Sequence, residues 1–224
     1  MLIVRVTAPP FKKYRKFKPY IRRSCKCKCV YCFIHESELG GPKFFTIDHF
    51  VPQSVDASLI NVYENLLYAC DECNSFKGDD WHDGNPILTG RGYLDPCKHD
   101  YDNHFRLEGT GKIKGLTKLA LYMIEHLWLN RPTRVNARGR RSLSIKRLAK
   151  IEKLILQAKD ILAASKDERK EIELRGIIQD LLAQKSLVQL HINELEGCRP
   201  ETDWKQKQQV RLIPRSKRTL RKTR

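Results

Sequence analysis

The chain has 224 residues, of which 41% are hydrophobic, so it can bury one ordinary domain, or a small domain with an extension, and it is not a disordered chain. Its formal net charge of +17 favours a nucleic-acid partner, with basic segments that only confer solubility as an equal alternative. No run of 18 apolar residues is present and the apolar start is shorter than a secretory signal, which predicts a cytoplasmic protein without membrane spans.

The first 28 residues predict a basic N-terminal arm, which contains ten Lys or Arg and no acid. A short strand is expected at its start. Its aromatic residues recur every three positions among lysines: Phe11, Tyr14, Phe17 and Tyr20. Such a segment either tracks a nucleic-acid groove or uses its rings to anchor the arm to the body of the protein, and both interpretations stay open.

The next part of the chain predicts the order strand, loop, strand, helix. A β-rich run over 43–51 stops at Pro52, and a second short strand covers 65–69. A helix is expected to follow, with Asp71 as its N-cap and its end near Gly78.

Beyond residue 80 a loop-rich stretch precedes regular helices. A β-hairpin is expected over 105–113, and helical periodicity begins at Leu116 and runs to Leu127. Asn130-Arg131-Pro132 should end that helix, and a new one is expected from Thr133.

Two longer amphipathic helices are predicted next, with apolar stripes over 148–162 and 172–195. Because each has a single apolar stripe, they predict an antiparallel helical hairpin over 143–197. Gly197 and Pro200 are expected to close the second helix.

Eight cysteines are present, and four of them form two Cys-x2-Cys pairs: Cys29, Cys32, Cys70 and Cys73. Tight pairs in a chain without an export signal favour metal ligation over disulfides, and four thiolates suit a tetrahedral structural Zn²⁺ site. Unligated buried cysteines are the alternative.

The other four cysteines are harder to assign. Cys25 or Cys27 could replace Cys29 as a ligand or serve as a spare. Cys97 and Cys198 have no obvious partner in the sequence, so ordinary packing is expected for both.

Residues suited to phosphodiester hydrolysis lie between the two cysteine pairs and just after the second pair. His49 is the predicted general base, because the ordinary pKa of imidazole makes its neutral form available at pH 7. Asp48 and Asn74 offer oxygen ligands of the kind that Mg²⁺ takes, and Lys77, one turn after Asn74, could contact phosphate. Adjacent strand residues point to opposite faces, so Asp48 and His49 converge only where the strand ends or bulges.

The order Cys-x2-Cys, Asp-His-x-x-Pro, Asn-Leu and Cys-x2-Cys-Asn-x-x-Lys resembles the zinc-containing HNH (ββα-metal) endonucleases, and 47–54 is also similar to the HNH domain of RNA-guided CRISPR nucleases. The resemblance implies His49 as general base, Asp48 and Asn74 as ligands of one catalytic Mg²⁺ or Mn²⁺, and Asn65 as the residue that braces the loop behind His49. The last motif position is Asn where many members have His, so the metal preference stays open.

The residues after this motif are similar, more weakly, to bacterial phage-defence HNH nucleases of the Septu type. The similarity lies in Tyr93-Leu94-Asp95-Pro96, Phe105, Gly111 and Leu129-Asn130-Arg131-Pro132. In that group the nuclease acts with an ABC-type ATPase, which implies that the hairpin 143–197 docks such a partner or forms a homodimer. Stripes that only pack on each other are the alternative.

These features together predict an α+β protein in four parts. They are a basic arm (1–28), a ββα-metal HNH nuclease domain with a four-cysteine zinc knuckle (29–115), a helical region with an antiparallel hairpin (116–198) and a basic tail (199–224). The predicted activity is metal-dependent hydrolysis of DNA in antiviral defence. A non-catalytic zinc-containing nucleic-acid-binding protein and a scaffold subunit are the alternatives.

Overall fold

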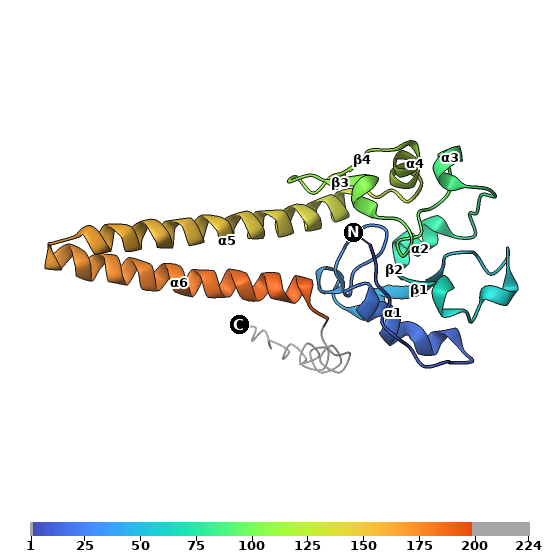
Figure 1. Ribbon diagram of the computed structural model, residues 1–224, viewed down its shortest axis with the longest axis horizontal. Helices are drawn as coiled ribbons and strands as arrows, with labels where there is room; N and C mark the ends of the chain where they lie inside the picture. Colours follow the sequence, from blue (N-terminus) through green and yellow to red (C-terminus); the bar gives the residue numbers. More distant parts are fainter. Residues whose placement is uncertain (1, 199–224) are drawn as a thin grey trace, which may run out of the picture.

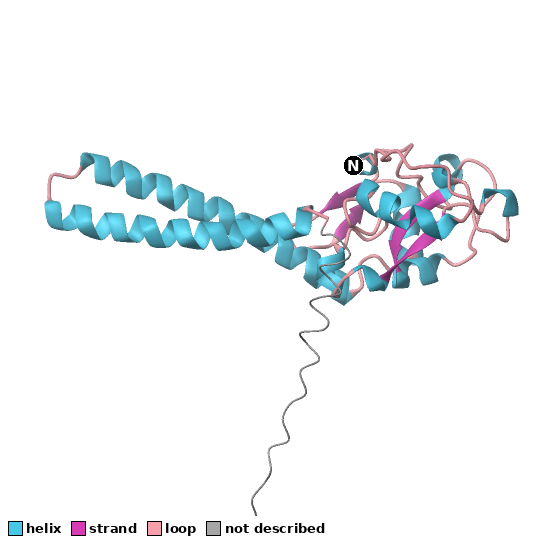
Figure 2. Cartoon of the chain, turned by 90° about the horizontal axis from the view of Figure 1, so that it is seen from below, coloured by secondary structure: helices cyan, strands magenta, loops and turns pink. Residues whose placement is uncertain are grey.

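The computed structural model describes residues 2–198, which form a head from which a long helical hairpin projects (Figure 1). The head contains two small antiparallel sheets, which Figure 2 shows as separate pairs of strands among helices and loops. The first sheet pairs β1 (Phe45–His49) with β2 (Leu66–Cys70), and the second pairs β3 (Phe105–Leu107) with β4 (Ile113–Gly115). The head therefore combines strands and helices as expected for an α+β protein.

The predicted order strand, loop, strand, helix is confirmed. β1 and β2 are largely buried, and α2 (Asp71–Lys77) begins directly after β2 and packs on both strands. Cys70 is the N-cap of α2, so the prediction that Asp71 has this role is wrong by one position. Cys70 belongs to the strand and the cap at once, which brings the second cysteine pair to the junction of sheet and helix.

The expected strand at the start of the chain is absent from the described residues. Ile3 donates its N–H to the Pro96 carbonyl at 2.8 Å and Val6 donates its own to Ser24 Oγ at 3.0 Å, so these groups are satisfied by a loop and a side chain and no ladder forms. The arm then enters η1 (Tyr14–Phe17) and α1 (Lys18–Ser24).

The arm belongs to the same hydrophobic core as the rest of the head. Phe17 and Ile21 are buried, and Phe17 stacks on Tyr63 with ring centroids 5.0 Å apart. The anchoring role of its aromatic rings is therefore confirmed for Phe17. The buried residues of the head form one core cluster, whose members range from Ile3 to Ala137. The division of the chain into four parts stays a prediction.

Short helices connect the larger elements of the head, and α4 (Lys118–His126) covers the second sheet. The remaining short helices are η2 (Glu36–Leu39), η3 (Pro42–Phe44), η4 (Ala57–Leu59), η5 (Tyr63–Asn65), α3 (Pro86–Thr89) and η6 (Tyr101–Asn103). Thr117 caps α4 by accepting the N–H of Ala120, which explains why the helix starts slightly later than its apolar periodicity.

The projecting hairpin consists of α5 (Pro132–Ala164) and α6 (Glu168–Glu196), which lie antiparallel as predicted. The helix expected from Thr133 begins at Pro132, because proline is tolerated in a first turn, but it is not separate from the amphipathic helix expected over 148–162, and the two form the single helix α5. Gly197 is the C-cap of α6 as expected, whereas Pro200 and the basic tail lie outside the described residues. No helix within 2–198 has both the length and the apolar run that a membrane crossing needs.

Two glycines allow the turn between β3 and β4 to approach α5 closely. Gly111 has φ +91°, and a Cβ on it would lie 2.1 Å from the carbonyl oxygen of Val135. A Cβ on Gly139 would lie 2.8 Å from the carbonyl oxygen of Thr110. This contact between backbones joins the base of the long hairpin to the head.

Replacing Gly139 by alanine should lower the free energy of unfolding, because the added methyl meets rigid backbone, and such overpacking typically costs about 1–3 kcal/mol. Gly176 in α6 is the matched control, since a Cβ there meets nothing within 4 Å. Gly176→Ala should therefore stabilise by about 0.5–1 kcal/mol. Chemical denaturation of both variants checks this, and equal shifts would contradict the close approach.

Candidate functional site

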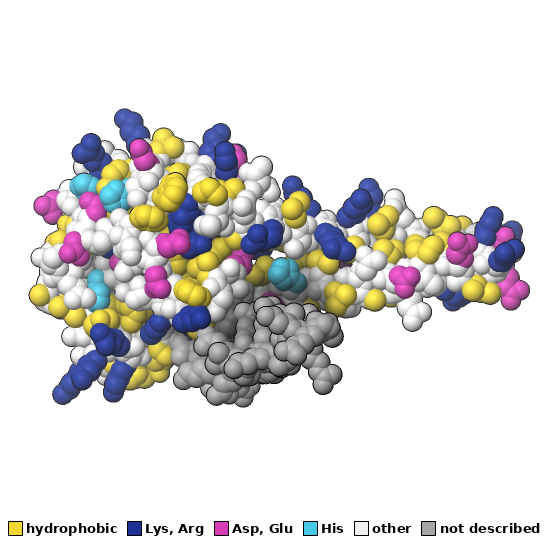
Figure 3. Space-filling view, turned by 180° about the vertical axis from the view of Figure 1, so that it is seen from behind, with side chains coloured by type: hydrophobic (Ala, Val, Ile, Leu, Met, Phe, Trp, Pro, Cys, Tyr) yellow, Lys and Arg dark blue, Asp and Glu magenta, His cyan; other side chains and the backbone are white. Residues whose placement is uncertain are grey.

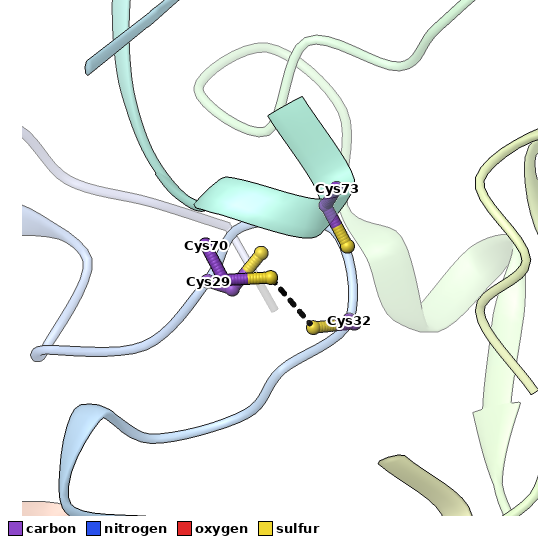
Figure 4. Close-up of side chains that lie close together, drawn as sticks. All are labelled: Cys29, Cys32, Cys70 and Cys73. Carbon is purple, nitrogen blue, oxygen red and sulfur yellow. Dashed lines mark hydrogen bonds between the residues drawn. The ribbon is translucent and has the colours of Figure 1, made fainter. Parts of the chain in front are cut away.

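Four cysteines meet in the interior of the head (Figure 4). Cys29 and Cys32 lie in the loop after α1, Cys70 ends β2, and Cys73 lies in α2. All four are buried, and their sulfur atoms lie within 4.8 Å of one another. Four thiolates at this mutual distance match the donor set of a tetrahedral site, so these residues could hold a zinc ion.

The backbone holds the first pair in place through the neighbouring strand. Val30 donates its N–H to the Tyr68 carbonyl at 3.0 Å, and Cys29 donates to the Ile34 carbonyl at 2.9 Å. These backbone hydrogen bonds hold the loop of the first cysteine pair against the strand that leads to the second pair.

Two of the remaining cysteines form a disulfide between Cys27 and Cys198. The expectation that Cys198 only packs, and that Cys27 is a spare ligand, is therefore wrong. The two positions are 171 residues apart, and only the return of α6 to the head brings them together. Cys25 and Cys97 are free, and burial raises the pKa of the Cys25 thiol to about 12, which disfavours the thiolate that a metal would need.

Three of the predicted site residues line one cleft of about 340 Å³ at the end of β1: Asp48, His49 and Asn74. His49 is the last residue of β1, and the chain turns immediately after it, with Phe50 donating its N–H to the Asn65 carbonyl at 2.8 Å. The end of the strand thus resolves the opposite orientation expected of two adjacent residues. The cleft is completed by Tyr14, Ile47, Pro52, Gln53, Ser54, Gly78 and Asp79.

The hydrogen bonds of His49 fix the tautomer of its ring. Nε2 lies 2.9 Å from the carbonyl oxygen of Ile60, which can only accept, so Nε2 carries the proton. Nδ1 is then left with its lone pair, and it accepts from Gln53 Nε2 at 3.0 Å. The Tyr14 ring meets the imidazole edge to face at 4.9 Å between centroids. This arrangement presents a basic nitrogen at the cleft.

Asp48 is buried and held by two donors. Lys77 Nζ donates to Oδ1 at 3.1 Å, and the Tyr31 hydroxyl donates to Oδ2. Burial raises the pKa of Asp48 above its ordinary value, and the Lys77 ammonium and the Tyr31 hydrogen bond limit the rise. Each carboxylate oxygen keeps a second lone pair, so the group can still take a cation from the cleft side.

Lys77 and Asn65 lie behind the cleft rather than in its lining. The Lys77 ammonium is buried, donates also to the His49 carbonyl at 2.9 Å and sits over the Tyr93 ring, so it does not face solvent. The Asn65 amide accepts the Val51 N–H at 2.8 Å and donates to the carbonyls of Val51 and Leu59. Asn65 therefore ties both ends of the loop that follows His49.

Residues 29–80 match the model of the HNH endonuclease family. This segment is an HNH domain. The chain is also similar to a Septu protein PtuB of Bacillus thuringiensis, with 27% identity over 147 residues, which cover 64% of this chain and 53% of that protein. The aligned region thus spans about half the length of the relative. No solved structure matches the chain.

The HNH domain contains site residues that sequence reasoning missed. Tyr31 and Gln53 hold Asp48 and His49 from within the domain, and Tyr14 reaches the cleft from the N-terminal arm. Tyr31 stands inside the first cysteine pair and Gln53 stands four residues after His49, but no spacing rule assigns either contact. The position of Tyr14 depends on how the arm folds, and no local pattern predicts it.

Proposed function

We propose that this protein is a metal-dependent endonuclease that hydrolyses phosphodiester bonds of DNA in a phage-defence system. The observation that carries the proposal is the meeting of Asp48, His49 and Asn74 in one cleft of an HNH domain. The similarity to a Septu protein PtuB supports the defence role.

The residues of the cleft suit the steps of hydrolysis. When water replaces the Gln53 amide as its partner, Nδ1 of His49 can accept a proton from that water, while the Ile60 carbonyl stabilises the imidazolium that forms. Asp48 and Asn74 supply the oxygen ligands, and the Asn74 side chain makes no described hydrogen bond that would compete. A divalent cation bound there would neutralise the charge that develops on the phosphate oxygens.

The surface beside the cleft supports a nucleic-acid substrate. Tyr14 forms part of the cleft wall, and four exposed basic side chains flank it in the arm: Lys12, Lys13, Arg15 and Lys16. Such a cluster favours binding of a phosphate backbone, because each contacted phosphate releases condensed counterions. The proposal gives the arm both roles that its sequence suggests, with Phe17 anchored in the core and the lysines directed to the DNA.

Cleavage of a supercoiled plasmid tests the proposal. The protein should nick it with Mg²⁺ and not with EDTA, and Asn74→Ala should raise the Mg²⁺ concentration required, because one oxygen ligand is lost. Asn103→Ala, at an exposed position outside the cleft, is the matched control. Salt-sensitive DNA binding without cleavage in Mg²⁺, Mn²⁺ or Ni²⁺ would instead identify a non-catalytic nucleic-acid-binding protein, and cleavage of RNA alone would reassign the substrate.

The hairpin is proposed to dock a partner, for which an ABC-type ATPase subunit is the first candidate and a second copy of this chain the other. Large apolar side chains stay exposed along it, as the yellow patches in Figure 3 show, among them Leu143, Leu154, Leu156, Ile161, Ile172, Leu187 and Leu190. Sedimentation of the wild type and of Leu187→Glu distinguishes these occupants. A monomer that binds the co-expressed ATPase supports the first, and a dimer lost in the variant supports the second.

A further inference from the structure

Three buried arginines at the base of the hairpin point into the HNH domain. Arg131 is the N-cap of α5, and Arg134 and Arg138 follow within its first two turns, so all three lie on one face of the helix. Their side chains are almost fully enclosed, with relative exposures of 3%, 3% and 1%. A guanidinium is rarely buried unless an anion compensates its charge.

Two of these arginines contact the cysteine cluster directly. Arg131 Nη2 lies 3.5 Å from Cys73 Sγ and 3.7 Å from Cys70 Sγ, and Arg134 Nη2 lies 3.8 Å from Cys70 Sγ. The same two side chains share Oε2 of Glu72, at 2.7 Å and 2.6 Å. Glu72 thus holds both guanidinium groups in the orientation that aims their N–H bonds at sulfur.

The third arginine has no carboxylate among its described partners. Arg138 donates to the carbonyls of Gly111, Leu129 and Cys32 at 2.7, 2.9 and 3.0 Å. These acceptors are neutral oxygens, and one of them belongs to a residue of the cysteine cluster. The charge of this buried cation is therefore not balanced by the hydrogen bonds that hold it.

The charges balance when the cysteine cluster is a metal-bound tetrathiolate. Among these contacts the only carboxylate is that of Glu72, which pairs with Arg131 and Arg134 through a half-exposed side chain, so three guanidinium groups and one carboxylate leave two positive charges. A divalent ion with four thiolates carries two negative charges, equal in size and opposite in sign. Four neutral thiols would leave the arginines uncompensated, at a cost of several kcal/mol for each buried ion.

We propose that Arg131, Arg134 and Arg138 are positioning residues of the zinc site, which balance the charge of a divalent-metal tetrathiolate and lock the hairpin onto the HNH domain. The inference rests on metal binding by the four cysteines and does not depend on nuclease activity. The guanidinium groups stabilise the negative charge of the tetrathiolate and hold its sulfurs in place, so a chelator removes the ion more slowly. The ion in turn holds the base of α5 in place.

Zinc release tests this proposal in the full zinc-loaded chain. Arg131→Gln/Arg134→Gln should transfer zinc to the chromogenic chelator 4-(2-pyridylazo)resorcinol about 10- to 100-fold faster than the wild type, the range found when partners that orient metal ligands are removed. Arg147→Gln is the matched control, because Arg147 is exposed further along the same helix. A release rate equal to that of the wild type would overturn the proposal.

A spectroscopic measurement separates this role from a general loss of folding, and hydrogen exchange tests whether the ion holds the base of the hairpin. In cobalt-loaded protein, the milder Arg134→Gln should move the thiolate-to-cobalt charge-transfer band to lower energy, because a hydrogen bond to sulfur is lost; an unchanged band contradicts the contact. Hydrogen exchange across 131–138 should accelerate when zinc is removed from the wild type. Unchanged protection there would show that the ion does not hold the hairpin.

Discussion

His49→Ala should lower the rate of plasmid cleavage by about 10²- to 10⁴-fold, the contribution typical of a positioned general base. The reason is geometric. Nε2 is committed to the Ile60 carbonyl, so the lone pair of Nδ1 is the one that can take a proton, once water displaces the Gln53 amide that donates to it. Alanine removes this acceptor and leaves the neighbouring Asp48 and Asn74 in place. Initial nicking rates at saturating Mg²⁺ measure the effect.

The control for this variant is His191→Ala, at an exposed position on the hairpin far from the cleft in sequence. It should retain wild-type cleavage. Both variants should bind zinc in the same amount as the wild type, since neither residue contacts the cysteine cluster among the described contacts. If His49→Ala cuts DNA as fast as His191→Ala, another group in the cleft accepts the proton and the assignment of the base is incorrect.

The elements that could be predicted are those determined by residues close together in the sequence. The two Cys-x2-Cys pairs impose tight loops, and the residues between them have the alternation and turn signals of two short strands and a helix. These signals place Cys70 and Cys73 at a strand-to-helix junction, where the structure has them. The apolar stripes of the long helices likewise specify their own pairing, because each stripe needs a partner.

The parts that could not be predicted depend on contacts between distant segments. Nothing near Cys27 indicates that Cys198 will return to it, and the burial of Lys77 against Asp48 follows from how α2 lies on the sheet. Residues 138–141 have the composition of a basic surface, yet Arg138 is among the most enclosed side chains of the head. A run of basic residues in the sequence indicates a charged segment, but it does not predict which of its side chains become buried.

The sequence around Gly139 in α5 likewise depends on a contact between distant segments. Gly139 and the basic residues around it resemble an interruption in the sequence, and a helix interior normally disfavours glycine by about 1 kcal/mol relative to alanine. Here the glycine is required, because the turn that contains Thr110 and Gly111 occupies the space of a side chain. A local propensity is thus outweighed by a tertiary contact that also fixes the direction in which the hairpin leaves the head.

Removal of zinc should unfold the head and leave much of the hairpin helical. A structural zinc site contributes about 10–16 kcal/mol of apparent binding free energy to folding, and a domain has only about 5–15 kcal/mol of net stability. The four cysteines lie in the core that joins β2 and α2 to the arm, so loss of the ion leaves buried polar sulfurs and uncompensated arginines together. By contrast, α5 and α6 bury Ile151, Ile155 and Ile178 outside that core, independently of the cluster.

Circular dichroism distinguishes these two regions, because the near-ultraviolet signal reports the tyrosines of the head and the far-ultraviolet signal is dominated by the long helices. Cys73→Ser should reproduce the effect of a chelator, whereas Cys97→Ser should not, since Cys97 is a free cysteine outside the cluster. All samples contain the same reductant, which keeps the state of the Cys27–Cys198 pair constant. If chelator-treated protein keeps its near-ultraviolet spectrum and its Tm, hydrophobic packing alone holds the head together, and the cysteine cluster does not stabilise the fold through a metal.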